Sequence, residues 1–302
     1  MKQQLLTLLD SQDNQHYYRY LLIDPLTSVS EMDFIDLNNI KDQLDDEAIT
    51  TVIRSDLAYD LASCPKLVTI GKPNLPLEKR LLHFSVVEAQ SEILQKKRYI
   101  CGWMVSQYPP EVVAEQITHI GRFLTKYMGT HFVPFYEPFR MQLLHQGNAV
   151  CPEFLADVLN CFQHYSYPTI NKTVNTIHHL GYKPENFTLF LSEEAKFYQQ
   201  HSNILFDIYL SQVNILTKTE KEIDNISLME IAESYHKACS YGLNALSDRK
   251  IFTLMSMTYG NLLSNTKIKQ AIDAAKFDEG SLIERFKAIE RPHFLSIKQA
   301  ER

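Results

Sequence analysis

Hydrophobic and polar positions alternate with helical spacing most clearly between Pro110 and Gly129. Pro110 has the fixed φ that suits a first helical turn, and Gly129 is placed for a left-handed cap. The apolar positions recur every three or four residues, as expected of one buried helix face: Val113, Ile117, Ile120, Leu124 and Met128. We therefore predict a helix from Pro110 to Met128 that buries one stripe of side chains.

A predicted strand flanks this helix on each side. Tyr99–Ser106 is rich in β-branched and aromatic residues, and Gly102, beside the only tryptophan, leaves room for another backbone to approach closely. His131–Tyr136 has similar composition. If both segments lie in one sheet, Tyr99–Leu144 contains a βαβ unit with a right-handed crossover.

The remaining N-terminal elements are shorter. Further strands are predicted at Tyr17–Ile23, Ala48–Ile53 and Cys64–Ile70. Helices are predicted at Gln3–Leu9, Leu77–Gln95 and Cys151–Tyr165, and the capping-box spacing of Ser85 and Glu88 predicts a break in the second of these. Thr169–Leu180 and Phe187–Leu191 have the apolar content of a small hairpin or sheet extension.

From Ser192 onward only helical patterns occur. Five helices are predicted, at Glu193–Leu216, Leu228–Tyr241, Asp248–Tyr259, Lys267–Lys276 and Leu282–Glu290. The pairing of Ser227 with Glu230 predicts a capping box, Ser192 and Ser247 are candidate caps, and Gly242 and Gly260 are candidate ends.

This distribution of elements predicts an α+β protein. An N-terminal α/β lobe with a small mixed sheet would comprise residues 1–191, and an all-helical C-terminal lobe would comprise residues 192–302.

The composition narrows the class of protein. The 302 residues are 45% hydrophobic and carry a mild net charge of −6, which argues against nucleic acid as a partner. Ile204–Leu216, the most apolar stretch, is too short to cross a bilayer and contains Asp207, so we expect no membrane association. The N-terminal leucine run is too short for a signal-peptide core. Five scattered cysteines are typical of reduced thiols, and we expect a cytoplasmic protein.

The usual motifs of cofactor, metal and hydrolase chemistry are missing from the sequence. It has no glycine-rich dinucleotide fingerprint, P-loop, zinc-ribbon spacing, H-E-x-x-H or G-x-S-x-G motif. His178 and His179 are the only histidine cluster, but on a strand their rings would point to opposite faces and would not share a metal. We therefore expect no cofactor and no metal.

Three residues are candidates for catalysis. Cys101 is the best candidate nucleophile, because a partner histidine need be adjacent only in space; a buried, unreactive thiol is the interpretation we favour. Asp24 and Glu137 each precede a proline at the end of a predicted strand and could form an acid/base pair, but turn capping explains both. We assign no catalytic, cofactor-binding or metal-binding residue.

Two charged stretches favour solvated surfaces over binding sites. The acidic residues between Glu31 and Glu47 lack the spacing and glycine of a calcium loop. Lys96, Lys97 and Arg98 close a predicted helix, where cations interact favourably with the helix dipole. Sixteen tyrosines, by contrast, are a weak indication of a protein-binding surface.

Read in order, five blocks resemble the type VI secretion effector-chaperone/adaptor family (VasW-like, with a Tap/Tec-type domain). They are LLIDPL (21–26), CPKLVTI (64–70), CGWMVS (101–106), AEQITHIGRFLTKYM (114–128) and THFVPFYEPFRMQLL (130–144). The resemblance covers roughly residues 17 to 145 and extends weakly into the helical half through YGLN (241–244) and the Tyr259-Gly260 helix end. The last of the five blocks departs from the family pattern of arginine, two aromatics, Asp, Pro and Arg. Pro134 replaces the first arginine, Glu137 replaces the aspartate, and Arg140 stands one place later.

The resemblance implies a cytoplasmic protein that is not an enzyme. It would bind a cognate toxic effector and promote its loading onto the VgrG-type spike protein of the secretion apparatus. The alternatives are a small hydrolase dependent on Cys101 or on Asp24 with Glu137, and a generic helical scaffold without a role in secretion.

Overall fold

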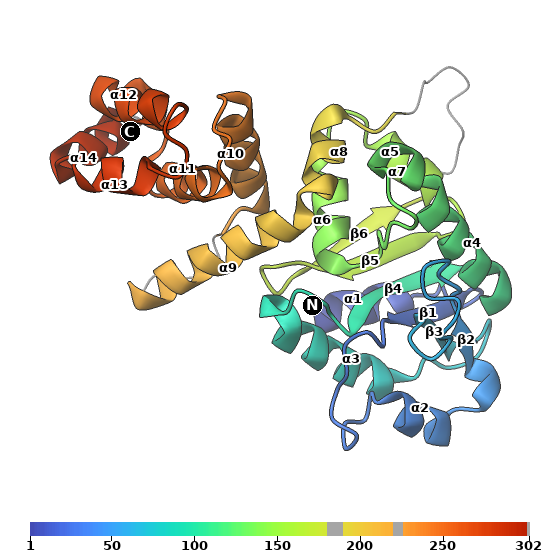
Figure 1. Ribbon diagram of the computed structural model, residues 1–302. Coiled ribbons are helices and arrows are strands. Elements are labelled where there is room, and N and C mark those ends of the chain that lie inside the picture. The colour runs from blue at the N-terminus through green and yellow to red at the C-terminus, as the bar shows by residue number, and fades with distance from the viewer. Residues whose placement is uncertain (180–189, 220–225, 301–302) are drawn as a thin grey trace. The chain divides into compact units, whose positions relative to one another are not determined.

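The computed structural model describes residues 1–179, 190–219 and 226–300 (Figure 1). The chain divides into two compact units, Met1–Gln199 and Gln200–Arg302. Unit 1 combines a sheet with helices, and unit 2 is helical throughout its described residues. The predicted α+β class is therefore confirmed.

The centre of unit 1 is a six-stranded sheet with the order β2-β3-β1-β4-β5-β6. Every neighbouring pair in it is antiparallel, so the expectation of a mixed sheet was wrong. The strands are β1 (Tyr18–Ile23), β2 (Ile49–Thr51), β3 (Lys66–Gly71), β4 (Ile100–Ser106), β5 (His164–Pro168) and β6 (Val174–His178).

The predicted βαβ unit is absent because 131–136 is not a strand. Its β-like composition contains Pro134, which lacks a ladder donor, and the segment packs instead against the helix before it. The Phe132 ring lies so close to Gly121 that a Cβ there would come within 2.3 Å of it. The backbone N–H of Val133 donates to the Gly121 carbonyl at 3.1 Å. The glycine is thus needed for close packing of this turn on the helix.

Helices cover both faces of the sheet (Figure 1). One face packs against α1 (Lys2–Leu9), α2 (Leu37–Gln43) and α3 (Lys79–Ser91). The other packs against α4 (Pro110–Phe123), α5 (Thr125–Met128), α6 (Pro138–Gly147), α7 (Glu153–Val158) and α8 (Glu193–Gln200). The predicted stripe is confirmed, since Val113, Ile117, Ile120, Leu124 and Met128 are all buried. Gly129 caps α5 with a left-handed φ of 66°, as predicted.

A bulge in β4 sets the direction of the Cys101 side chain. Leu22 opposes Gly102 whereas Ile23 opposes Ile100, so Cys101 is the extra residue between them. A Cβ on Gly102 would lie 2.6 Å from the backbone oxygen of Ser166 in β5. The prediction that Gly102 permits close backbone approach is confirmed.

Several local predictions need correction. The helix α3 runs through Ser85 without a break and continues as the 3₁₀ turn η2 (Glu92–Leu94). Ser85 is not a cap, because its hydroxyl donates to the Leu82 carbonyl and accepts from the Trp103 indole. The helix expected at Cys151–Tyr165 is only the short α7, followed by β5. Within the predicted extension Phe187–Leu191, residues 187–189 lie outside the described part of the chain.

The helices of unit 2 follow most of the sequence pattern. They are α9 (Ser202–Lys218), α10 (Leu228–Ser240), α11 (Leu246–Tyr259), α12 (Thr266–Ala275), α13 (Leu282–Lys287) and α14 (Arg291–Ala300), with η3 at Leu262–Ser264. The single helix predicted at Glu193–Leu216 is, however, divided at His201 into α8 and α9. Ser227 caps α10 by accepting from the Glu230 N–H, as predicted, whereas α11 begins before Ser247. The helix α14 was not predicted. No helix among the described residues is long and apolar enough to span a membrane.

Candidate functional site

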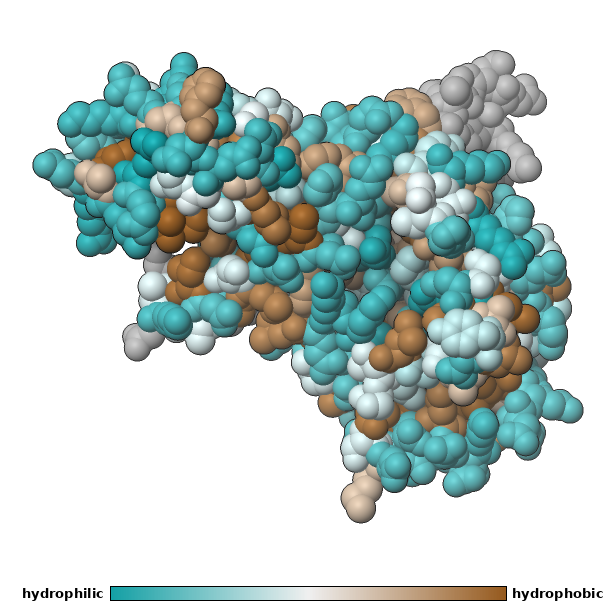
Figure 2. Space-filling view, viewed as in Figure 1, coloured by the Kyte–Doolittle hydropathy of each residue, from teal (hydrophilic) through white to brown (hydrophobic). Residues whose placement is uncertain are grey.

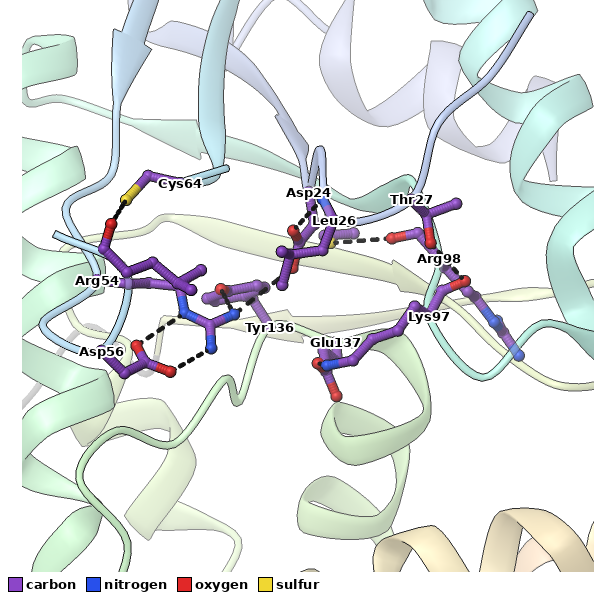
Figure 3. Close-up of polar contacts among 12 residues, drawn as sticks. Asp24, Leu26, Thr27, Arg54, Asp56, Cys64, Lys97, Arg98, Tyr136 and Glu137 are labelled. Carbon is purple, nitrogen blue, oxygen red and sulfur yellow. Dashed lines mark hydrogen bonds and ion pairs between the residues drawn. The ribbon is translucent and has the colours of Figure 1, made fainter. Parts of the chain in front are cut away.

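A buried polar cluster lies where β1 and β2 end and where β4 and α6 begin (Figure 3). Asp24 follows β1 directly and is 2% exposed. Its Oδ1 accepts from the Leu26 N–H at 3.0 Å, which closes the turn at Pro25. Its Oδ2 lies 3.8 Å from an Arg54 nitrogen and has no hydrogen-bond partner among the described residues. Asp24 is therefore the turn cap that its place before a proline indicated.

Arg54 is the cation at the centre of this cluster. Its Nε and Nη2 donate to the two carboxylate oxygens of Asp56 at 3.1 and 2.6 Å, and its Nη1 donates to the Tyr136 hydroxyl at 3.1 Å. Its guanidinium also lies 5.3 Å from the centre of the Phe132 ring. This bidentate pairing holds the pKa of Asp56 below its usual value. Arg54 thus ties the segment after β2 to the turn before α6.

Glu137 is engaged by two cations. Lys97 contacts its Oε1, and the Arg140 Nε donates to its Oε2 at 3.1 Å. The second guanidinium edge of Arg140 donates to the Gln199 carbonyl at 3.3 Å. Within the segment 130–144, Arg140 therefore pairs with Glu137, which also contacts Lys97.

Burial determines the protonation of Asp24. It raises the pKa of Asp24 to about 6, against the lowering effects of the Leu26 N–H and of Arg54, and the charge of Glu137 raises it further. Asp24 and Glu137 therefore interact electrostatically. Neither carboxylate is free, because Glu137 is held by two cations and Asp24 is almost fully buried.

Cys101 joins the same cluster but is not activated. It is 0% exposed, and its thiol donates to the Arg98 carbonyl. Burial raises the pKa of the Cys101 thiol well above its ordinary value, and the charges of Asp24 and Glu137 raise it further. A nucleophilic cysteine needs the opposite environment, one that stabilises the thiolate. The structure brings the three candidates together, but as a buried structural network.

Sequence reasoning missed a second buried carboxylate. Glu92 is 0% exposed and accepts from the N–H groups of Tyr99 and Ile100 at 2.5 and 3.1 Å. Burial raises its pKa to about 7, although both hydrogen bonds act in the opposite direction. Glu92 therefore satisfies the backbone donors of Tyr99 and of Ile100, where β4 begins. Arg54 and Asp56 were also missed, although a charged pair directly after a short strand is a detectable signal.

The other charged segments have mixed outcomes. The prediction of a solvated end was wrong for Arg98, which is 3% exposed and donates to the Ile93 carbonyl. Asp45, Asp46 and Glu47 are exposed, as expected of a solvated face. No group of three or more potential metal ligands is assembled within the described residues.

A groove that sequence reasoning also missed lies between α2 and α3. It has a volume of about 860 Å³, and we call it the α2–α3 groove. The Phe34 and Phe84 rings form its aromatic floor at 4.9 Å, and the Arg80 guanidinium stacks 4.2 Å from Phe34. Met32 and Val87 on its rim are 95% and 49% exposed. Four carboxylates line it against the single cation of Arg80: Glu31, Asp33, Asp42 and Glu88.

Exposed apolar groups occur elsewhere on the surface too. Figure 2 shows hydrophobic side chains in patches among polar ones. In unit 2, Phe277 is 92% exposed. An exposed apolar side chain alone is ordinary. The α2–α3 groove differs because an aromatic floor, an apolar rim and an excess of negative charge occur together.

Comparison with known proteins gives no match: no family model, no curated protein and no solved structure corresponds to this chain.

Proposed function

We propose that this chain is an adaptor chaperone of type VI secretion that is not an enzyme. It binds a cognate toxic effector in the cytoplasm and promotes loading of the effector onto the VgrG-type spike protein. The five blocks that resemble the family support this proposal. They coincide with the end of β1, with β3, with β4, with α4 and α5, and with the turn into α6.

The main observation in support of the proposal is that the three candidate catalytic residues are buried or held by other residues of the chain. Cys101 is fully buried with a raised thiol pKa, Asp24 closes a turn, and Glu137 is held by Lys97 and Arg140. A substrate would have to displace the core to reach Asp24 or Cys101. These residues are therefore better explained as architecture than as a hydrolase site.

We further propose that the α2–α3 groove binds the effector. Its four carboxylates against one guanidinium favour a segment that carries Lys or Arg. The Phe34 and Phe84 rings and the exposed Val87 offer apolar area for a neighbouring aliphatic or aromatic anchor. The occupant that fits is thus a basic, partly apolar segment of the effector.

Coexpression tests this function. A candidate effector, such as a large toxin from an adjacent gene, is produced with and without the chain, and its soluble yield and its copurification with the chain are measured. We expect the chain to raise the soluble yield and to form a stable complex. Equal solubility without the chain, and no complex, would refute the proposal.

A substitution at Cys101 distinguishes the proposed adaptor from the alternative, a hydrolase that depends on Cys101. Cys101→Ala removes the candidate nucleophile, and a mechanism that depends on its thiol would then be lost. We expect the variant to bind and solubilise the toxin as the unchanged chain does. Loss of this function in a Cys101→Ala variant whose unfolding temperature equals that of the unchanged chain would favour the hydrolase.

A further inference from the structure

Two histidines 14 residues apart in the sequence face each other across strands β5 and β6. His164 and His178 are direct cross-strand partners in this antiparallel pair. Their Nδ1 atoms lie 3.0 Å apart, and their rings are inclined by 79°. The partner of His178 is therefore His164 and not its sequence neighbour His179. Adjacent residues of a strand point to opposite faces, whereas cross-strand partners share a face, so His164 and His178 can bind one metal.

The pair is accessible from outside. The strand β6 is the last strand of the sheet, His178 is exposed, and His164 is half-buried. Both rings line a hollow of about 550 Å³ together with Asp13. A cation can thus enter from solvent, and the carboxylate of Asp13 favours its approach.

The distance between the two nitrogens suits one kind of metal. For metal–nitrogen distances of about 2.0–2.1 Å, a separation of 3.0 Å corresponds to an angle of about 95° at the metal. That angle is close to the right angle between neighbouring ligands in tetragonal sites, which Ni²⁺ and Cu²⁺ prefer with nitrogen ligands. We propose that His164 and His178 bind one divalent metal ion of this kind, Ni²⁺ or Cu²⁺, with water in the remaining positions.

The protonation of the pair allows this binding. The hydrogen bond between the two Nδ1 atoms requires one of them to carry a proton and the other to accept it. The proton on the donating ring can occupy Nε2 instead of Nδ1. Both Nδ1 atoms are then unprotonated, with no net loss of a proton, and rotation of the two rings turns their lone pairs from one another toward a shared metal.

Calorimetric titration of the untagged, full-length chain with NiCl₂ at pH 7.5 tests the site. We expect one equivalent of Ni²⁺ to bind. Removing a residue that only hydrogen-bonds a metal ligand weakens metal binding about 10–100-fold. Removing a ligand itself, as in His164→Asn and His178→Asn, should therefore weaken Ni²⁺ binding at least about tenfold. His119→Asn, which changes an exposed histidine on α4, is the matched control and should bind as the unchanged chain does.

Thermal unfolding provides the second readout. Ni²⁺ should raise the unfolding temperature of the unchanged chain and of His119→Asn, since a ligand of the native state stabilises it. Ni²⁺ should not raise the unfolding temperature of His164→Asn or His178→Asn. Their unfolding temperatures without metal check that both variants fold. Absence of Ni²⁺ binding to the unchanged chain, or equal binding by His164→Asn, would overturn the site. Tighter binding of Zn²⁺ than of Ni²⁺ would overturn the tetragonal geometry.

Discussion

The Asp24 carboxylate lies 3.8 Å from the Arg54 guanidinium, yet its Oδ2 accepts no hydrogen bond from any described residue. Arg54 instead directs its bidentate edge to Asp56 and its remaining nitrogen to Tyr136. Asp24 is thus a buried acid near a cation that is mainly committed elsewhere. Its ionised form is destabilised, and this has a measurable consequence.

Asp24→Asn should change how stability depends on pH. The folded pKa of about 6 lies above the ordinary 3.8, so the folded state binds the proton more tightly and loses stability as pH rises from about 4 to 6. The shift corresponds to about 3 kcal/mol. Relative to the unchanged chain, the variant should therefore gain about 2 kcal/mol between pH 4 and pH 7.5 in urea unfolding. The same stability difference at both pH values would contradict a raised pKa.

Arg54→Met should destabilise unit 1 strongly. It leaves the Asp56 carboxylate and the Tyr136 hydroxyl without their Arg54 partner and removes the cation near Asp24. The Asp56 side chain is 34% exposed, so the loss comes mainly from the buried Tyr136 hydroxyl and Asp24 carboxylate, and we expect about 2–3 kcal/mol. A double-mutant cycle compares urea unfolding of Arg54→Met, of Asp24→Asn and of the variant that carries both substitutions. The loss should be smaller when Asp24 is already neutral, and strict additivity would show that the two residues are not coupled.

Glu92→Ala should loosen the start of β4. The substitution removes the acceptor of two buried N–H groups, those of Tyr99 and Ile100, and we expect a loss of about 2–4 kcal/mol. Hydrogen exchange should show faster opening at these two amides. Glu115→Ala, at an exposed position on α4, should change stability by less than about 0.5 kcal/mol. Unchanged protection of both amides in Glu92→Ala would refute the assigned role.

Val87→Asp should weaken effector binding without unfolding the chain. It places a further negative charge on the rim of the α2–α3 groove and removes apolar area there. Leu61→Asp is the matched control, because Leu61 is also an exposed aliphatic residue of unit 1, 53% exposed against 49%, and does not line the groove. Affinity for the effector should fall at least about tenfold for Val87→Asp alone, equivalent to 1.4 kcal/mol. Equal affinity in the two variants would place the binding surface elsewhere.

Local signals in the sequence predicted the elements well where neighbouring residues decide the conformation. The stripe of α4, the left-handed Gly129 and the cap at Ser227 each depend on a few adjacent positions. The segment 131–136 was misread because its composition favours a strand, whereas packing of Phe132 on Gly121 decides its structure.

The buried cluster depends on residues that only the folded chain brings together. Asp24 and Glu137 were recognised from their prolines, but their shared surroundings depend on Arg54, Lys97 and the start of β4. The pairing of His164 with His178 likewise depends on the register of β5 and β6. No periodicity or spacing rule predicts such contacts from one sequence.

Recovery of the effector on the spike protein tests the central claim most directly. The VgrG-type spike protein is captured from cells that produce the candidate effector toxin with this chain, without it, or with the Val87→Asp variant. Our account predicts that the amount of toxin recovered on the spike falls when the chain is absent and falls similarly with Val87→Asp. Equal recovery of the toxin in the presence and absence of the chain would contradict a role in effector loading.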